Sequence, residues 1–264
     1  MKSTIKNQSK KLLIVAMALG VFATACKTTN PTAPSLPPSS SMNMDNSYSG
    51  GQSNKTASGL NCAAAVTAIG WFDLIIDLNV AIPVASFNEA MKHEAVYDAN
   101  AKEWVWSYNV VVVGITYTAN LHASESGDNI NWKMVISQQG GFQNFTWYTG
   151  VSKKDGTSGT WSLIKSPNAN VSFLDIAWNK NSSAGTADTK FTYVEPNQSG
   201  TNSYVWWKLT TDIEYNGHYD IYNASNQQLT QIMWNKTNKN GEIISADSTT
   251  HCWDNTQQDI ICTK

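Results

Sequence analysis

The stretch "EWVWSYNVVVVGITYTANLHAS", residues 103–124, decides the fold class of this chain. Its aromatic residues Trp104, Trp106 and Tyr108 recur at every second position. From residue 115 to residue 122, apolar side chains alternate in the same way with threonine, asparagine and histidine. Alternation with a period of two, in a segment rich in aromatic and β-branched residues, is typical of half-buried β-strands. The stretch therefore predicts strands with one face in a core and the other in solvent.

The same alternation continues along the chain, for example in "INWKMVIS" at residues 130–137, and turn-rich segments separate the candidate strands. The Asn-Gly pair at residues 216–217 is the strongest turn signal, because both residues tolerate the positive φ of a tight hairpin. About a dozen candidate strands joined by short loops predict an antiparallel up-and-down meander. Because the meander must bury its apolar face, we expect a mainly β fold curled into a barrel or half-barrel, with two packed sheets as the alternative.

A short motif recurs as "INWKM" at residue 130, "IAWNK" at residue 176 and "IMWNK" at residue 232. Each copy has an apolar residue, one intervening position and a tryptophan, but the spacings between the copies are unequal. A solenoid requires a constant period, so the motif does not indicate one. We interpret it as one hairpin design that is used three times.

An apolar helix is expected before the strands, in "CAAAVTAIGWFDLIIDLNVAIP" at residues 62–83. Thr67, Gly70, Asp73 and Asp77 fall on one narrow stripe of this helix, and the rest of its surface is apolar. Two aspartates argue against a bilayer span, so protein must surround it. We expect the helix to pack on or in the barrel, either as a core helix or as a lid over a cavity. Pro83 is expected to end it, with a short second helix after it.

The N-terminus carries the features of an export signal. Four lysines in the first eleven residues precede the apolar run "LLIVAMALGVFATA", residues 12–25, which is too short to span a bilayer comfortably. The sequence "ATAC" at residues 23–26 resembles the lipobox of bacterial lipoproteins, although Ala23 stands where that family most often has leucine. This resemblance covers only residues 1–26 and implies cleavage before Cys26 and acylation of Cys26 with palmitate-type chains. The alternative is an ordinary secretory signal with an incidental cysteine.

Three segments follow from this organisation: a signal peptide at residues 1–25, a lipidated tether at 26–59, and a single helix-plus-β-barrel domain at 60–264. The tether is dominated by proline, serine, threonine, asparagine and glycine. It holds too little apolar surface to offset the entropy of ordering, so we expect it to be disordered.

Composition argues against several function classes. All 18 basic residues are lysine, and without arginine the chain lacks the planar group that reads guanine and grips phosphate with two hydrogen bonds. We therefore expect no nucleic-acid partner. No catalytic motif, metal-ligand spacing or phosphate-binding loop is present, so we expect no enzyme activity, no cofactor and no metal site. Asp212, Glu214 and Asp220 flank the Asn-Gly turn and are interpreted as solvated side chains.

Eleven tryptophans are a large number for this length, and two explanations compete. Tryptophan fills wide cores, and exposed tryptophan also forms flat platforms for sugars. Trp206 and Trp207 are adjacent in "YVWWKL", so their side chains must point to opposite sides of one strand. One of them should face away from the main core. We name Trp71, Trp206 and Trp207 as candidate ligand-binding residues.

With Cys26 assigned to lipid, Cys62, Cys252 and Cys262 remain, which is an odd number. We favour a disulfide between Cys252 and Cys262 across a C-terminal hairpin, with Cys62 as a buried free thiol. The alternatives join Cys62 to either of the other two cysteines.

These features together predict a non-enzymatic lipoprotein of the bacterial cell envelope. We expect a lipid anchor in the outer membrane, with the domain facing the periplasm or the surface. The leading hypothesis is that the helix-covered sheet binds a lipid-like or other apolar ligand. The alternatives are a surface carbohydrate-binding module that uses exposed tryptophans, and a purely structural envelope protein.

Overall fold

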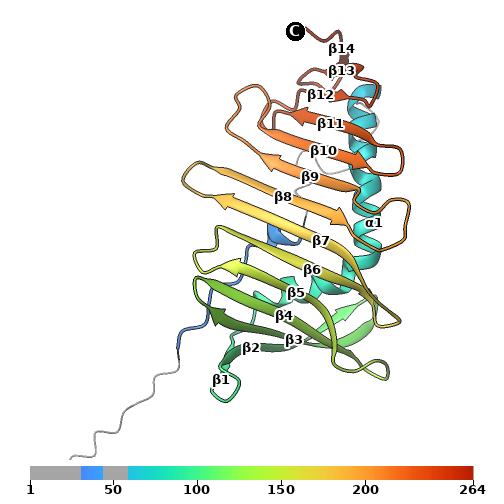
Figure 1. Ribbon diagram of the computed structural model, residues 1–264. Helices are drawn as coiled ribbons and strands as arrows, with labels where there is room; N and C mark the ends of the chain where they lie inside the picture. The colour runs from blue at the N-terminus through green and yellow to red at the C-terminus, as the bar shows by residue number, and fades with distance from the viewer. Residues whose placement is uncertain (1–30, 44–58, 264) are drawn as a thin grey trace, which may run out of the picture. The chain divides into compact units, whose positions relative to one another are not determined.

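The computed structural model describes residues 31–43 and 59–263, except for the side chains of residues 71–79. These residues form one antiparallel sheet of fourteen strands in which each strand pairs with its neighbours in sequence (Figure 1). The mainly β, up-and-down prediction is therefore confirmed. The strands are β1 (Val96–Asp98), β2 (Glu103–Val112), β3 (Ile115–Ser126), β4 (Asn129–Gln138), β5 (Phe145–Lys153), β6 (Ser158–Ser166), β7 (Ala169–Asn181), β8 (Thr186–Tyr193), β9 (Tyr204–Leu209), β10 (Gly217–Asn223), β11 (Gln228–Trp234), β12 (Gly241–Ile244), β13 (Thr250–Trp253) and β14 (Asp259–Ile260).

The sheet is open, so of the two expected forms, a barrel or a half-barrel, the closed barrel is wrong. A barrel closes only when its first and last strands pair, and here β1 and β14 are the two free edges of the sheet. Both edge strands are very short, with three and two residues. Short edges limit pairing with other chains, which is how open sheets avoid edge-to-edge association.

The helix α1 (Leu60–Ala90) covers the apolar face of the sheet in place of a second wall. It contacts β12, β13 and β14 as well as β2, β3 and β6, so it runs along the stack of strands (Figure 1). At 1.5 Å per residue a helix of 31 residues is about 46 Å long, which suits this role. We call the sheet face toward α1 the inner face and the opposite face the outer face.

The helix continues through Pro83, which corrects the expectation that it ends there and that a second helix follows. Proline normally breaks a helix interior because it lacks the N–H and crowds the preceding turn. Here the segment after the proline is held by packing, since Phe87 and Ala90 are completely buried. The Tyr108 hydroxyl on β2 also donates to the Ser86 carbonyl at 2.6 Å.

Side chains of the inner face form two hydrophobic clusters. The larger cluster joins Val80, Phe87 and Ala90 of the helix to strands β2–β8. The smaller cluster joins Cys62, Ala65 and Ile69 to strands β9–β13. The two halves of the helix therefore pack against different parts of one sheet.

The recurring tryptophan motif has a structural explanation on the inner face. Each tryptophan of the motif lies directly opposite a glycine of the neighbouring strand. A Cβ on Gly159 or Gly217 would meet the ring of that same tryptophan, and a Cβ on Gly150 would meet the ring of Trp161, which lies opposite Gly150 on its other side. Glycine leaves room for the ring to lie flat over the backbone, an arrangement that pins the register of neighbouring strands. The pairs are Trp132 with Gly150, Trp178 with Gly159 and Trp234 with Gly217.

Residues 31–43 lie within the segment that was expected to be a disordered tether, yet they pack on the sheet. They include the 3-10 helix η1 (Ser39–Ser41), and Ser41 and Met42 are buried. The Trp161 indole N–H donates to Ser41 Oγ at 3.1 Å, and the Thr189 hydroxyl donates to the Ser40 carbonyl at 3.1 Å. This corrects the tether prediction for these residues, because a few apolar side chains and hydroxyl groups anchor a segment of mainly polar composition.

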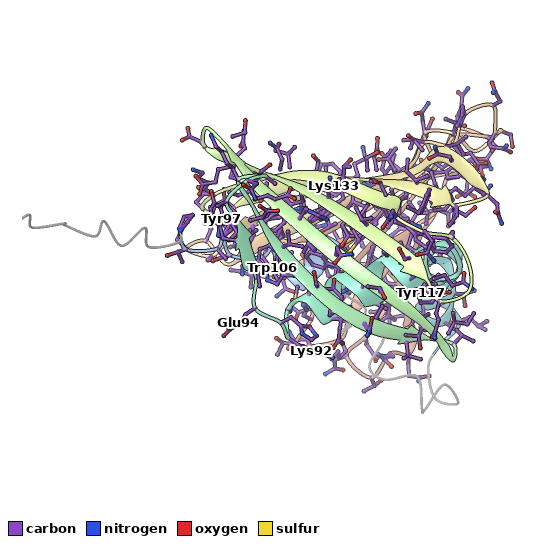
Figure 2. All side chains as sticks on the ribbon, turned by 90° about the horizontal axis from the view of Figure 1, so that it is seen from below. Lys92, Glu94, Tyr97, Trp106, Tyr117 and Lys133 are labelled. Carbon is purple, nitrogen blue, oxygen red and sulfur yellow. A yellow bond between two sulfur atoms is a disulfide. The ribbon has the colours of Figure 1, made fainter. Side chains whose placement is uncertain are left out.

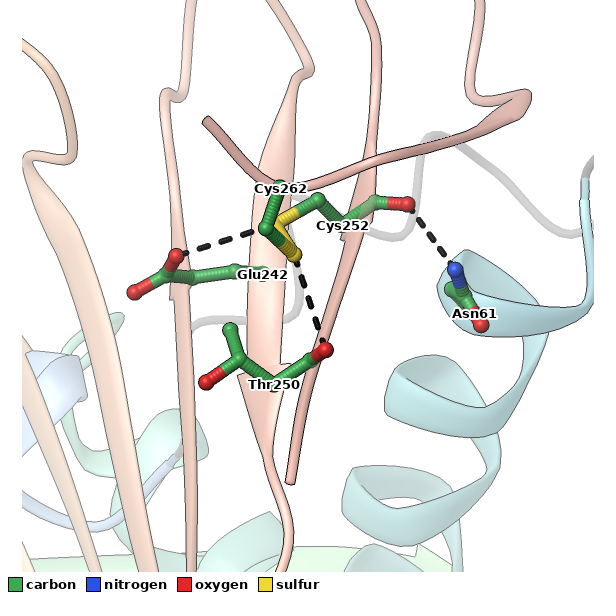
Figure 3. Close-up of a disulfide and its surroundings, with 5 residues drawn as sticks. All are labelled: Asn61, Glu242, Thr250, Cys252 and Cys262. Carbon is green, nitrogen blue, oxygen red and sulfur yellow. Dashed lines mark hydrogen bonds between the residues drawn. A yellow bond between two sulfur atoms is a disulfide. The ribbon is translucent and has the colours of Figure 1, made fainter. Parts of the chain in front are cut away.

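The C-terminal hairpin carries the disulfide that the sequence favoured. Cys252 and Cys262 are bonded, with their Cα atoms 5.3 Å apart, and Cys62 is a buried free thiol. Burial raises the pKa of the Cys62 thiol, and the nearby charge of Asp259 adds to the rise. Figure 3 shows the disulfide beside the first turn of α1, where the Asn61 side-chain amide donates to the Cys252 carbonyl at 2.9 Å. Within the described residues, α1 is not apolar enough along its length to qualify as a membrane span.

Candidate functional site

The two adjacent tryptophans of β9 point to opposite faces of the sheet, as predicted. Trp207 lies on the inner face and is 4 % exposed. Trp206 lies on the outer face and is only partly buried. The other tryptophans whose side chains are described are all buried, so Trp206 is the one with a ring open to solvent. The buried ones are Trp104, Trp106, Trp132, Trp147, Trp161, Trp178, Trp207, Trp234 and Trp253.

The Trp206 ring is held in place by its neighbours on β8 and β9. Its indole N–H donates to Asp188 Oδ2 at 3.1 Å. The Lys208 ammonium lies 4.1 Å from the ring centroid and the Lys190 ammonium 5.7 Å from it. Both distances are within the range of cation–π attraction. The platform is therefore oriented before any ligand arrives.

The carboxylates around Trp206 are occupied by side-chain donors. Asp220 forms an ion pair with Lys208 and accepts a hydrogen bond from Gln231 at 3.1 Å. Asp188 also accepts from the Asn179 amide at 3.2 and 3.3 Å. Asp220 is thus part of a network rather than simply solvated, which corrects the sequence interpretation.

Asp212 has a different role, because its side chain shapes the β9–β10 loop. Its Oδ1 atom accepts the backbone N–H groups of Glu214 and Tyr215 at 2.8 and 2.9 Å. These two hydrogen bonds lower the pKa of Asp212. Asp212 and Asp220 are therefore engaged in separate interactions and do not form a carboxylate pair.

A pair of tyrosines extends the aromatic surface next to Trp206. Tyr204 and Tyr222 are stacked on neighbouring strands, with ring centroids 5.3 Å apart and planes at 28°. The Lys190 ammonium lies 3.8 Å from the Tyr204 ring. Burial, and then the charge of Asp220, raises the pKa of Tyr204, so its hydroxyl stays a neutral donor at physiological pH. We call Tyr204, Trp206 and Tyr222, with Lys190 and Lys208, the outer platform.

A hollow of about 450 Å³ opens beside the outer platform at the ends of β5, β7 and β9. Its lining combines one aromatic ring with amide, hydroxyl, ammonium and carboxylate groups, including Asn179, Asp188, Trp206, Lys208 and Thr210. A second hollow of about 710 Å³ lies on the middle of the sheet, with the small outer-face side chains Thr149, Thr160, Ser162, Ala177 and Thr192 in its lining. The lining of the second hollow also includes the apolar residues Val151, Trp161 and Ile176. Both hollows use strands β5–β8, so a hollowed surface of mixed polarity leads along the sheet to Trp206.

Other candidates from the sequence do not join this site. Cys26 lies outside the described residues, and so does the side chain of Trp71, whose backbone is in α1. Cys252 and Cys262 serve the C-terminal hairpin. In the part of the chain that the structure describes, no three His, Cys, Asp or Glu side chains gather as a metal site would require.

Sequence reasoning found Trp206 but missed its partners. Tyr204 and Lys208 each lie two positions from Trp206 on β9, so strand geometry alone could have placed all three side chains on one face. Asp188, Lys190 and Tyr222 come from other strands and required the pairing register, in which Lys190 lies opposite Trp206. Comparison with known protein families, curated proteins and solved structures finds no match for this chain.

Proposed function

We propose that this chain is a lipid-anchored protein of the bacterial cell envelope that binds glycans on the outer face of its sheet, without catalysing a reaction. One observation carries the proposal: Trp206, unlike the other described tryptophans, is partly exposed, and it borders a hollow whose lining includes amide, hydroxyl and charged side chains. Of the hypotheses that the sequence allowed, we therefore favour the carbohydrate-binding module over the carrier of an apolar ligand.

The chemistry of the site matches a sugar ring. A sugar presents C–H groups on its faces and hydroxyl groups at its edge, so it suits a rigid aromatic surface beside hydrogen-bonding side chains. Asn179, Asp188 and Lys208 supply donors and acceptors next to the ring. Their mutual hydrogen bonds and ion pairs hold the site in one arrangement, which reduces the entropy lost on binding.

The inner face gives less support to an apolar ligand. Nine described tryptophans are buried, and α1 with residues such as Ser41 and Met42 packs over the same face. In this proposal the open sheet acts as a half-barrel around its own helix and keeps its outer face for the ligand.

Cys26 supplies the anchor in this proposal. Two or more acyl chains bind a bilayer stably, whereas one chain binds only marginally. We expect Cys26→Ala to remain uncleaved and to lose the mass of the acyl chains. Mass spectrometry of the N-terminal peptide reads this directly, and an unchanged mature mass in the variant would exclude lipidation at this residue.

Glycan binding is tested with immobilised neutral polysaccharides, both α-linked and β-linked, and with peptidoglycan. Trp206→Ala should weaken binding by about tenfold or more, because a central aromatic contact is worth at least 1.4 kcal/mol at a binding hot spot. Ile213→Ala is the matched control, since Ile213 is apolar and 94 % exposed in the β9–β10 loop. The proposal fails if no polysaccharide binds, or if both variants bind like the unmodified protein. New reducing ends in the polysaccharide would contradict the non-enzymatic part alone.

A further inference from the structure

The tip of the β2–β3 hairpin exposes aliphatic side chains that none of the described residues covers. Val113 is 95 % exposed, Val111 is 64 % exposed and Ile115 is 41 % exposed. Val112 pairs with Ile115, so Val113 and Gly114 form a two-residue turn at the end of two long strands. Single exposed apolar residues are ordinary, but here three β-branched ones surround one projecting tip, with Val111 and Ile115 on its two faces and Val113 at its end.

Val113 is also a poor residue for the turn that it occupies. Its φ is +49° and that of Gly114 is +75°, so both turn residues have positive φ. Two-residue hairpin turns with positive φ at both positions strongly favour Asn-Gly, and a β-branched residue there is a genuine outlier. Valine at this position costs stability and gains little packing against the described residues, since it is 95 % exposed. Strain that persists at an exposed position points to a role outside the fold.

The two chain segments that form the tip and its neighbouring loop carry no Asp, Glu, Lys or Arg, although Glu89, Lys92 and His93 at the end of α1 lie further along β2, beside Tyr108. No Asp, Glu, Lys or Arg occurs between residues 104 and 121 or between residues 134 and 152. The second of these segments includes the β4–β5 loop, which lies against the hairpin: the Gln139 N–H donates to the Thr116 carbonyl at 3.2 Å. Amide and hydroxyl side chains, including Asn109, Thr118, Gln138 and Gln143, surround a hollow of about 340 Å³ here.

Aromatic rings lie directly behind the tip. Tyr117 follows Ile115 on β3, and its ring centroid is 6.3 Å from that of Phe142 in the β4–β5 loop. Phe142 in turn contacts Phe145 and Trp147. Figure 2 shows Tyr117 near one end of the long strands, away from Tyr97 and Trp106. Tyr117 and Trp147 are buried, whereas Phe142 and Phe145 are partly exposed, so the exposed groups from the tip inward are aliphatic side chains, then uncharged amides and two phenylalanine rings.

We infer that this tip inserts into a lipid bilayer. The order of groups matches the polarity of a membrane interface, where aliphatic side chains enter the hydrocarbon and aromatic and amide groups occupy the headgroup level. A narrow hairpin end enters a fluid bilayer without needing a complementary pocket. Because these two segments carry no charged side chain, the tip enters without the cost of burying a charge. The inference concerns a surface separate from the outer platform and holds whether or not a glycan binds there.

The test places an environment-sensitive fluorophore at Val113→Cys in the purified mature protein. Val96→Cys is the matched control, because Val96 is also an exposed valine, 73 % exposed, on the edge strand β1. The probe is a vesicle of phosphatidylcholine and phosphatidylglycerol, with or without lipids that carry a quencher in the acyl chain. Labelling of the otherwise unmodified chain measures any background from Cys62.

The label at position 113 should shift to shorter wavelength with vesicles and be quenched by the acyl-chain quencher, whereas the label at position 96 should respond to neither. Equal responses at both positions would overturn the inference, as would the absence of any response at position 113. A shift at position 113 that appears without vesicles and grows with protein concentration would overturn it in favour of contact between two copies.

A second variant separates insertion from folding. Val113→Asn suits the positive φ of the turn and removes the aliphatic group, so it should raise the melting temperature. With the fluorophore at Val111→Cys, acyl-chain quenching at increasing vesicle concentration measures vesicle affinity. The Val113→Asn change should weaken this affinity about tenfold, roughly the effect of losing one buried aliphatic side chain. Unchanged quenching in a stabilised Val113→Asn protein would contradict the proposed role of the tip. Lipidation of Cys26 is read separately from the N-terminal mass, so failure of one proposal leaves the other testable.

Discussion

Single glycines on the inner face determine how closely neighbouring strands and their tryptophans approach. A Cβ at position 159 would lie 2.8 Å from the Trp178 ring and 2.7 Å from the Val151 carbonyl. Neither group can move easily, since Trp178 is 2 % exposed and the carbonyl belongs to the sheet. A side chain at position 159 therefore cannot be accommodated by a small movement of its neighbours.

We predict that Gly159→Ala destabilises the protein by about 1–3 kcal/mol, the usual cost of overpacking a core. Gly70→Ala is the control, because a Cβ at Gly70 in α1 meets nothing within 4 Å. The control should be neutral or stabilise by about 0.5–1 kcal/mol, since alanine favours helix over glycine. Urea denaturation at equilibrium measures both, and equal stabilities of the two variants would contradict the glycine–tryptophan account.

Glu195 links the β8–β9 loop to β6. Lys165 Nζ lies 2.7 Å from Glu195 Oε1, and the Tyr193 hydroxyl donates to Oε2 at 2.9 Å. The hydrogen bond from Lys165 is the main cause that lowers the pKa of Glu195 below its ordinary value of 4.5. Burial, together with the hydrogen bond to Glu195, raises the pKa of Tyr193 to about 12.

The direction of the Glu195 shift fixes a pH dependence. A lowered pKa in the folded state means that the ionised carboxylate stabilises the fold above the unfolded pKa, and that this contribution is lost as pH falls through the folded pKa. We predict that Glu195→Gln is less stable than the unmodified protein at pH 7 and that the difference shrinks below pH 4.5. Thermal melts across this range measure it, and a difference that stays constant with pH would contradict the assignment.

Residue-level reasoning from the sequence succeeded where one strand sufficed and failed where contacts cross strands. The opposite orientations of Trp206 and Trp207 follow from strand geometry alone. The contact of Trp206 with Asp188 depends on the register between β8 and β9, which no local pattern encodes. The Asp220–Lys208 pair was missed for the same reason.

Among the elements, α1 and the C-terminal hairpin depend on each other. The helix begins after Gly59, which has no capping side chain, and Asp259 of β14 supplies the cap instead. Asp259 accepts the backbone N–H groups of Leu60 at 3.1 Å and Asn61 at 2.9 Å. A carboxylate at a helix N-terminus satisfies free N–H groups and complements the positive end of the helix dipole. The nearby disulfide holds β14 against β13, which keeps Asp259 in place.

We predict that Asp259→Ala costs about 1–2 kcal/mol, as expected for loss of a helix cap. Asp247→Ala is the control, because Asp247 lies in the β12–β13 turn and its Oδ1 accepts a local backbone N–H from Thr249. Hydrogen exchange should show faster opening of the first turn of α1 in the Asp259 variant and not in the control. Protection of residues 60–65 that is equal in both variants would rule out the capping role.

Element boundaries show which patterns carry information in this chain. Period-two alternation located the long strands β2, β3 and β4 because each of them has one buried face. The end of α1 was misplaced at Pro83, since propensity argued for a break and tertiary packing of Phe87 and Ala90 prevailed. The Cys252–Cys262 pair was accessible from spacing, because both cysteines fall in one short hairpin.

At the scale of the whole molecule, the order of the strands could be predicted from the sequence, but whether the sheet closes into a barrel could not. Consecutive pairing follows from short loops, whereas closure depends on whether β1 and β14 can meet, and both are too short to be recognised as edges from sequence. The packing of residues 31–43 was likewise hidden, because a segment rich in proline and serine contributes only a few anchors, Ser41 and Met42 among them.

The two faces of the sheet differ in what covers them. The inner face is occupied by tryptophans, α1 and residues 39–42, and the outer face carries Trp206 and two hollows. The central claim is that the ligand binds on the outer face and leaves the inner face closed.

Hydroxyl-radical footprinting of the tryptophans, read by mass spectrometry with and without the bound polysaccharide, tests that claim most directly. Oxidation should be faster at Trp206 than at Trp207, and the polysaccharide should protect Trp206 while the rates at Trp207 and Trp178 stay unchanged. Protection of Trp178 or Trp207 with no protection of Trp206 would place the ligand on the inner face and contradict the account.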